Sequence, residues 1–193
     1  MRNKLLIIDN YDSFTYNLVQ MVEQCGVNNF VIMKNDKITL SEASNFDYFL
    51  FSPGAGIPSE AGIMCEMIRH FASQKKMLGI CLGHQAIAES FGAKLIQLEN
   101  IMHGIASDIY IDNQKYDSIF KNMNSKFICG RYHSWIVSRV NFPEELAITA
   151  IDINQDIMAI KHKKYNIHGV QFHPESFITQ DGIKIIRNWL FSK

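Results

Sequence analysis

The chain has 193 residues, 47% hydrophobic and 20% charged, which is the composition of an ordinary globular protein with room for a substantial core. Its 19 basic and 19 acidic residues give a formal net charge of zero. No field of one sign is therefore available to attract nucleic acid or an anionic membrane, and we expect neither as a partner.

The amino-terminal end carries a short apolar run, residues 5–8, which stops at Asp9. This run is too short for the apolar region of a signal peptide, and no later stretch approaches the roughly 18 apolar residues of a membrane span. The four cysteines show neither CxxC pairing nor a zinc-like spacing with histidine. We therefore expect a cytoplasmic, reduced location and at least one cysteine that is free for chemistry.

The amino-terminal half alternates unbroken apolar runs with amphipathic segments. The runs predict strands at 5–8, 30–33, 48–51 and 77–80. The amphipathic segments predict helices from a cap at Asp12 or Ser13 to about Gly26, from 60 to 71, and from 82 to 91. Residues 52–58 contain two prolines and two glycines, which predicts a loop. This alternation indicates an α/β fold with a mostly parallel central sheet and helices on both faces.

Residues 93–159 have a different pattern, with little helix. Ile109 and Ile111 alternate with polar residues, and 127–128 and 147–150 resemble further short strands. We interpret this part as a small antiparallel addition to the parallel sheet. The chain then returns to a strand at 167–172 and a helix at about 181–191. Because no repeat, linker or low-complexity tract interrupts the sequence, residues 1–193 are expected to form a single domain.

Cys81 is the strongest candidate nucleophile. It lies at the centre of the segment 79–83, GICLG, between a predicted strand and a predicted helix. Glycines two residues before and two after a nucleophile let a strained turn pass close to neighbouring backbone. The following helix would direct its free N–H groups at the sulfur, favouring the thiolate and an oxyanion beside it. Most free cysteines are buried hydrophobic groups, and we assign the other three to that class.

A thiolate nucleophile needs a base that is held by a third group. His173 follows an apolar strand and precedes a proline that stiffens the turn, and Glu175 can accept a hydrogen bond from its imidazole. On its own this segment could be an ordinary polar loop. His84, one turn after Cys81, should face away from the sulfur. The remaining histidines are expected to be solvated or structural.

At this point the residues resemble a known family, the class I (triad) glutamine amidotransferases. Segments 79–85 (GICLGHQ) and 169–176 (GVQFHPES) resemble its two signature segments. Segments 9–18, 52–62, 102–104 and 131–135 narrow the resemblance to the glutaminase subunits of anthranilate synthase and aminodeoxychorismate synthase. The likeness covers essentially the whole chain and implies the flavodoxin-like fold of this family.

The resemblance implies a mechanism. Cys81 would attack the side-chain carboxamide of glutamine, His173 would protonate the departing ammonia and later activate water, and Glu175 would orient the imidazole. The oxyanion would be held by the backbone N–H groups of Gly54 and Leu82. Further residues would surround the substrate or face a partner. The substrate group comprises Ala55, Gly56, Gln85, Ser134 and Trp135, and the partner group comprises Met102, His103 and Gly104.

The resemblance also implies a partner, a synthase subunit that uses chorismate and ammonia. It would be component I of anthranilate synthase, for tryptophan biosynthesis, or of aminodeoxychorismate synthase, and one glutaminase subunit can serve both. No metal or other cofactor is expected in this chain, whereas magnesium is expected in the partner. From the sequence alone, segment 102–104 is better explained as a simple turn between strands, and residues 9–15 are open to a similar interpretation as a helix cap.

Two residues depart from the common pattern of the family. Ala55 replaces a proline of the usual Pro-Gly-Pro-Gly loop, which frees φ and adds an N–H group. Trp135 stands where leucine is frequent. Neither change removes a residue of the triad.

Other interpretations remain. Carbamoyl-phosphate and GMP-synthesising amidotransferases share the two signature segments but fit residues 10–15 poorly. A stand-alone cysteine hydrolase would turn over glutamine without a partner. A non-enzymatic binding module on the same scaffold would need an incompetent triad, although Cys81, His173 and Glu175 are all present.

Overall fold

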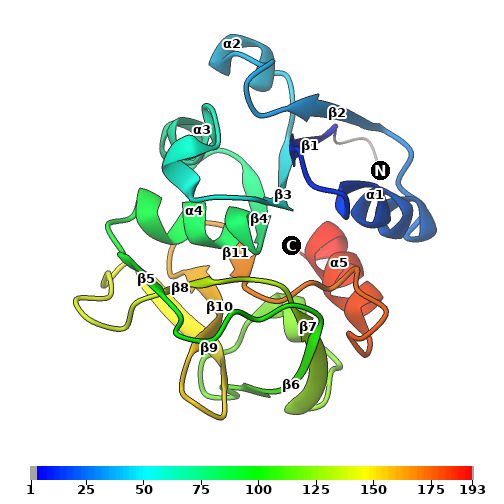
Figure 1. Cartoon of the computed structure of the whole chain (residues 1–193). Helices are drawn as coiled ribbons and strands as arrows, with labels where there is room; N and C mark the ends of the chain where they lie inside the picture. The colour runs from blue at the N-terminus through cyan, green and yellow to red at the C-terminus, as the bar shows by residue number, and fades with distance from the viewer. Residues whose placement is uncertain (1–3, 193) are drawn as a thin grey trace.

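The computed structural model describes residues 4–192; residues 1–3, part of the amino-terminal segment interpreted above, lie outside this range. A nine-stranded sheet in the order β2-β1-β3-β4-β11-β10-β9-β6-β7 runs through the molecule, with helices packed on both faces (Figure 1). A separate two-stranded sheet pairs β5 with β8. The predicted α/β class and the mostly parallel sheet with an antiparallel addition are confirmed, although the antiparallel part is larger than expected.

The parallel half contains the apolar strands that the sequence predicts. Its members are β2 (Phe30–Lys34), β1 (Leu5–Asn10), β3 (Tyr48–Gly54), β4 (Lys76–Ile80) and β11 (Ile167–Val170). All neighbouring pairs among them are parallel. Strands β1 and β4 are buried along their whole length, as expected for strands covered on both faces.

The two faces of the sheet bury two separate sets of side chains. Leu5 and Ile7 of β1 point into a core with the helices α1 (Thr15–Gln24) and α5 (Gly182–Phe191). Leu6 and Ile8 point the opposite way, into a core with α3 (Met64–Phe71) and α4 (Leu82–Ser90). Figure 1 shows α1 beside α5 and α3 beside α4, so the period of two along each strand separates two layers of helices.

The second half of the chain extends the sheet with antiparallel strands. These are β6 (Ile105–Ile111), β7 (Lys126–Arg131), β9 (Leu146–Asp152) and β10 (Ile157–His162). β10 joins the two halves because it pairs antiparallel with β11. The small sheet consists of β5 (Leu95–Gln97) and β8 (Trp135–Val137), and a 3₁₀ turn, η2, spans Ser118–Phe120. None of the helices formed by residues 4–192 has the length and apolar character needed to cross a membrane.

The predicted helix at 60–71 is wrong at its start. A 3₁₀ turn, η1, covers Pro58–Glu60, and the helix begins only at Met64. Between them Gly62 adopts a φ of +55°, and a Cβ there would lie 2.4 Å from the Asn35 backbone oxygen. The chain therefore has to turn at Gly62 to pass Asn35, which interrupts the helix.

Three further local predictions need correction. The loop predicted at 52–58 begins later because β3 continues to Gly54, across an irregularity in its pairing with β1 that accommodates Pro53. Neither Asp12 nor Ser13 caps α1: Phe14 holds the cap position without a side-chain cap, and the Asp12 carboxylate accepts from the Phe14 N–H. A short helix, α2 (Leu40–Ala43), was not predicted, although Thr39 and Glu42 form its capping box.

Candidate active site

Cys81 sits at a sharp turn between β4 and α4, with φ +51° and ψ −99°. A positive φ is strained for a residue other than glycine, so the surrounding structure must hold this turn in place. Its N–H donates to the Val170 backbone oxygen over 2.8 Å, which ties the turn to β11. The predicted strand–turn–helix setting of this cysteine is confirmed.

The two glycines of the turn are required by close packing. A Cβ on Gly79 would lie 2.3 Å from the backbone carbon of Gly83, and a Cβ on Gly83 would lie 2.6 Å from the Phe51 backbone oxygen. Side chains do not approach backbone this closely, so only glycine lets α4 begin directly against β3 and β4. The sequence predicted this close approach of backbone at both positions.

His173 and Glu175 reach the same end of the sheet. β11 runs parallel to β4, with Val170 opposite Ile80, so the chain after β11 emerges beside Cys81. Nδ1 of His173 donates to Oε1 of Glu175 over 2.7 Å, and both side chains are buried. Burial alone lowers the pKa of His173, but its interactions with Cys81 and Glu175 outweigh burial and raise the pKa to about 10. The imidazole is therefore held in its charged form, next to the sulfur.

Two aromatic rings cover the imidazole. The ring centroids of Tyr132 and Phe14 lie 4.9 and 5.5 Å from that of His173, and the Tyr132 hydroxyl is 3.0 Å from Oγ of Ser176. Phe14 comes from the segment 9–18, so this segment contributes to the site as well as to the turn before α1. The sequence did not identify either ring as part of the site.

The loop that follows β3 approaches the start of α4. A Cβ on Gly54 would lie 2.6 Å from Cδ2 of Leu82 and 2.7 Å from Cβ of Asn10, so Gly54 and Leu82 are neighbours. The Asn10 amide donates to the Ser52 backbone oxygen over 2.7 Å, and Ser52 Oγ accepts from the Asn10 N–H. This buried network fixes the end of β3 beside Cys81. The segments that carry the two N–H groups predicted to bind the oxyanion, those of Gly54 and Leu82, are therefore neighbours.

A pocket of about 170 Å³ opens next to Cys81. Most of the residues predicted for substrate binding line it, together with Met102 and His103 of the predicted partner-facing group. The lining comprises Gly54, Ala55, Gly56, Cys81, Gln85, Ile101, Met102, His103, Tyr132, His133, Ser134 and Trp135. Leu82 and Gly104 are not in the lining; Gly104 follows His103 in the exposed rim, with φ +68°. Met102 is tied to the pocket wall because its N–H donates to the His133 backbone oxygen over 3.0 Å.

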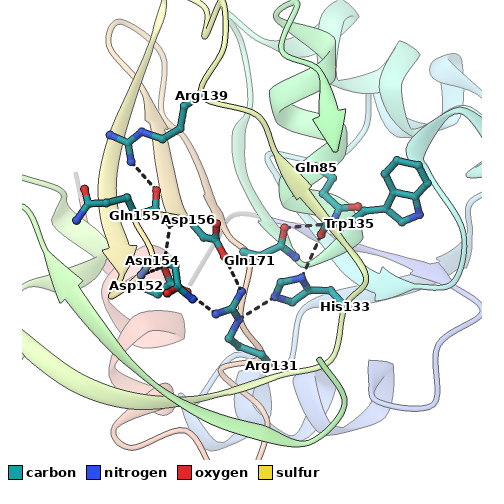
Figure 2. Close-up of polar contacts among 10 residues, drawn as sticks. All are labelled: Gln85, Arg131, His133, Trp135, Arg139, Asp152, Asn154, Gln155, Asp156 and Gln171. Carbon is teal, nitrogen blue, oxygen red and sulfur yellow. Dashed lines mark hydrogen bonds and ion pairs between the residues drawn. The ribbon is translucent and has the colours of Figure 1, made fainter. Parts of the chain in front are cut away.

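Besides the two aromatic rings, two polar side chains at the site were not predicted from the sequence. Gln171 is fully buried, and its amide nitrogen lies 3.6 Å from the Cys81 sulfur. Oε1 of Gln171 accepts a hydrogen bond from Nε2 of Gln85 over 3.1 Å. His133 contacts the backbone of Trp135 through Nδ1 (Figure 2). Both residues belong to segments that carry the family resemblance, but no spacing or periodicity marks them as part of the site.

The other candidates lie apart from the reactive groups. Burial lowers the pKa of His84 to about 4, and its ring packs against Gly169. Nδ1 of the buried His168 lies 2.8 Å from Oδ1 of Asp117, and His70 is exposed. All four cysteines are free, and burial raises the pKa of Cys25, Cys65 and Cys129. Within residues 4–192 there is no group of three or more His, Cys, Asp or Glu side chains arranged to hold a metal ion.

Comparisons with known proteins agree with this geometry. Residues 6–193 match the protein family described as glutamine amidotransferase class-I. The chain is 44% identical over 188 residues to the aminodeoxychorismate/anthranilate synthase component 2 of Bacillus subtilis, covering 96% of this chain and 95% of that protein. It is 42% identical over 193 residues to the anthranilate synthase component 2 of Pseudomonas putida, covering 96% of each.

The fold also matches a solved structure. A protein from Thermoplasma acidophilum, described as a candidate GMP synthase subunit, superposes with a TM-score of 0.85 at 26% identity, covering 98% of this chain and 94% of that one. The sequence is thus more similar to the component 2 proteins than to this structural neighbour.

Proposed function

Because the chain belongs to the class-I glutamine amidotransferase family, we propose that it is the glutaminase subunit of anthranilate synthase, which supplies ammonia to a chorismate-using synthase subunit. The observation that carries this proposal is the grouping of Cys81, His173 and Glu175 beside a pocket that Cys81 lines, in a chain with component 2 relatives at 42–44% identity. The activity would serve tryptophan biosynthesis.

In the proposed reaction the Cys81 thiolate attacks the side-chain carbonyl carbon of glutamine. Negative charge then develops on the carbonyl oxygen, next to the N–H groups of Gly54 and Leu82. The His173 imidazolium gives its proton to the departing nitrogen, so ammonia leaves and a glutamyl thioester remains on the sulfur. The neutral imidazole then removes a proton from water, which attacks the thioester and releases glutamate. The raised pKa of His173 supports the first proton transfer, because the imidazolium is present at neutral pH.

The pocket supports glutamine as the substrate. A volume of about 170 Å³ matches a small amino acid better than a peptide or a nucleotide. Polar groups that could hold the α-amino and α-carboxylate groups come from Gln85 and from the backbone at Ser134 and Trp135. The rim at Ile101, Met102 and His103 would face the synthase subunit, so that ammonia passes directly between the two proteins.

A second pathway is supported by one specific observation. The Bacillus subtilis relative carries both names, aminodeoxychorismate and anthranilate synthase component 2. We therefore propose as the alternative that this chain serves aminodeoxychorismate synthase, or both synthases. No cofactor is proposed for this subunit, magnesium is proposed for the synthase subunit, and the reduced cytoplasm is proposed as the location because all four cysteines are free.

The proposal is tested by co-expressing the chain with a candidate synthase subunit from the same organism and supplying chorismate and glutamine. Anthranilate as the only product supports the leading assignment, and formation of both products supports the shared role. Aminodeoxychorismate as the only product overturns the leading assignment. Cys81→Ala should abolish product formation from glutamine but not from added ammonium salt, because only the nitrogen donor has been lost. Cys65→Ala, which removes a thiol outside the pocket, should keep both reactions.

A further inference from the structure

A continuous chain of polar contacts connects the β9–β10 turn to the pocket (Figure 2). It begins at Arg131, whose side chain is only 1% exposed. Nη1 of Arg131 donates to Oδ2 of Asp152 over 2.5 Å, and Nη2 lies 3.3 Å from Oδ2 of Asp156. A buried guanidinium needs such partners, since a buried charge without an opposite charge beside it is strongly destabilising. The arginine is therefore fixed in position by the hairpin turn.

The Nε–H group of this guanidinium determines which nitrogen of His133 carries the proton. Nε of Arg131 donates to Nε2 of His133 over 3.1 Å. Arginine has no lone pair to accept with, so Nε2 must be the unprotonated nitrogen and the ring proton must sit on Nδ1. Nδ1 then donates to the Trp135 backbone oxygen over 3.1 Å. Burial, and next the Arg131 charge, lower the pKa of His133 to about 3, so the ring stays neutral.

The Trp135 carbonyl in turn orients Gln85. It accepts a second hydrogen bond, from Nε2 of Gln85 over 2.8 Å, so both of its acceptor positions are used. The same amide nitrogen donates to Oε1 of Gln171 over 3.1 Å, and the Gln171 amide nitrogen is 3.6 Å from the Cys81 sulfur. If the Gln85 amide were reversed, its oxygen would face two other oxygens, so only one orientation is compatible with the network.

From this geometry we infer that His133, held by Arg131, is a positioning residue that fixes the Trp135 carbonyl and, through it, the Gln85 amide, so that Oε1 of Gln85 faces the α-amino group of glutamine. This inference rests on the proposed function, in which Gln85 and the backbone at residues 134–135 form the glutamine-binding wall. His133 does not act on the reacting carbonyl. It makes one edge of the pocket rigid before the substrate arrives, which reduces the entropy lost on binding.

The test compares two reagents that both alkylate Cys81. A chloroketone analogue of glutamine needs the α-amino and α-carboxylate contacts, whereas iodoacetamide needs only an accessible thiolate. His133→Phe keeps an aromatic ring but loses both hydrogen bonds. We expect this variant to be labelled by the chloroketone about tenfold more slowly. Most of the effect should be a higher chloroketone concentration for half-maximal rate, and less of it a lower limiting rate. The iodoacetamide rate should stay within about twofold of the wild type, since the thiol itself is untouched.

Two further variants separate positioning from folding. His133→Asn places an amide donor near the position of Nδ1 and should recover much of the chloroketone rate. His168→Phe makes the same change at a buried histidine whose partner is Asp117, so it should lower the thermal midpoint without changing the ratio of the two rates. Thermal unfolding of every variant shows whether it is folded at the assay temperature.

The outcomes distinguish the inference from the proposed function. If His133→Phe slows both reagents equally, or slows neither, or if His168→Phe changes the ratio as much, His133 has no special positioning role and the inference is overturned. If the chloroketone fails to label Cys81 in the wild type while iodoacetamide succeeds, the proposed function fails first. Selective slowing in His133→Phe with recovery in His133→Asn supports the inference.

Discussion

His173 is the titrating residue on which the proposed chemistry depends. Its pKa is raised to about 10, so folding favours the imidazolium. The corresponding contribution to stability is fully present below the unfolded pKa of about 6.5 and is lost as the pH rises through about 10. Glu175→Gln removes one of the two interactions that raise this pKa, and we therefore expect the His173 pKa to fall, as measured by NMR titration of its ring nitrogens.

A matched change on the surface provides the control for this prediction. Glu144 is exposed, so Glu144→Gln removes the same charge outside the site and should leave the His173 titration unchanged. An unaltered His173 titration in Glu175→Gln would mean that the carboxylate does not hold the imidazolium. In the glutaminase reaction the same variant should lose roughly 10²-fold or more in kcat, because general-acid catalysis by a positioned group contributes about that much.

At the scale of single residues, the sequence predicted where the candidate reactive groups lie better than it predicted the side chains that support them. Cys81 and His173 stand at strand ends, and such positions can be recognised from an apolar run followed by a turn. Gln171 and His133 act through long-range contacts, with 86 residues separating Gln171 from Gln85. No local pattern encodes such a contact, because it exists only once β11 and β8 have been brought to α4.

Among the elements, the turn between β4 and α4 has the least tolerance for change. Gly79→Ala or Gly83→Ala would place a Cβ 2.3 or 2.6 Å from backbone atoms, which can be relieved only if α4 shifts. We expect each variant to lose at least about 2 kcal/mol of unfolding free energy, measured by urea denaturation. Because α4 carries Leu82 and Gln85, labelling of Cys81 by the glutamine chloroketone should be lost as well.

The other end of the same helix offers a control. Gly92 has a φ of +96° but no atom within 4 Å of the place that a Cβ would occupy, so Gly92→Ala meets backbone strain without a clash. It should cost about 1 kcal/mol and leave chloroketone labelling intact. Equal loss of labelling in the Gly83 and Gly92 variants would show that α4 stability, rather than the close approach at its start, controls the site.

Elements with strong local signals were predicted well, and those shaped by tertiary contacts were not. The apolar runs of β1 and β4 were predicted because a strand buried on both faces has no polar position. The start of α3 was missed because its boundary depends on Asn35, far away in sequence, which touches Gly62. β5 and β8 are three residues each and pair only with one another, so neither has enough length for a recognisable period.

Across the whole molecule, one sheet joins the parallel and antiparallel halves through the pairing of β10 with β11. We therefore predict that residues 1–193 unfold as a single cooperative unit. The two tryptophans report on different parts of the molecule: Trp189 is buried on α5, which packs against the large sheet, and Trp135 lies on β8 of the separate two-stranded sheet. Trp135→Phe and Trp189→Phe each keep one tryptophan. In both variants, the fluorescence of that tryptophan and the far-UV circular dichroism should follow the same urea transition.

Separate midpoints for the two probes within one variant would contradict this prediction. They would mean that one part of the molecule unfolds independently of the rest, and that the absence of a linker in the sequence does not imply a single domain. The order of the strands in the sheet could not be predicted from the hydrophobic pattern of the sequence. Periodicity indicates which runs form strands, whereas the position of β11 between β4 and β10 follows from long-range packing.

The pairing of β4 with β11 also has a consequence for how such a protein can diversify. Ile80 and Val170 are neighbours in parallel register, so strand spacing, about 4.8 Å, sets the distance at which the chain segments carrying Cys81 and His173 leave the sheet. The intervening chain makes an excursion through the rim of the pocket and the antiparallel strands before it returns. Insertions or replacements within that excursion can remodel the rim, where we propose that the partner docks, while Cys81 and His173 keep their relative position. In this architecture, the rim can therefore change to suit a new ammonia acceptor without altering the strand pairing that places Cys81 and His173 for glutamine chemistry.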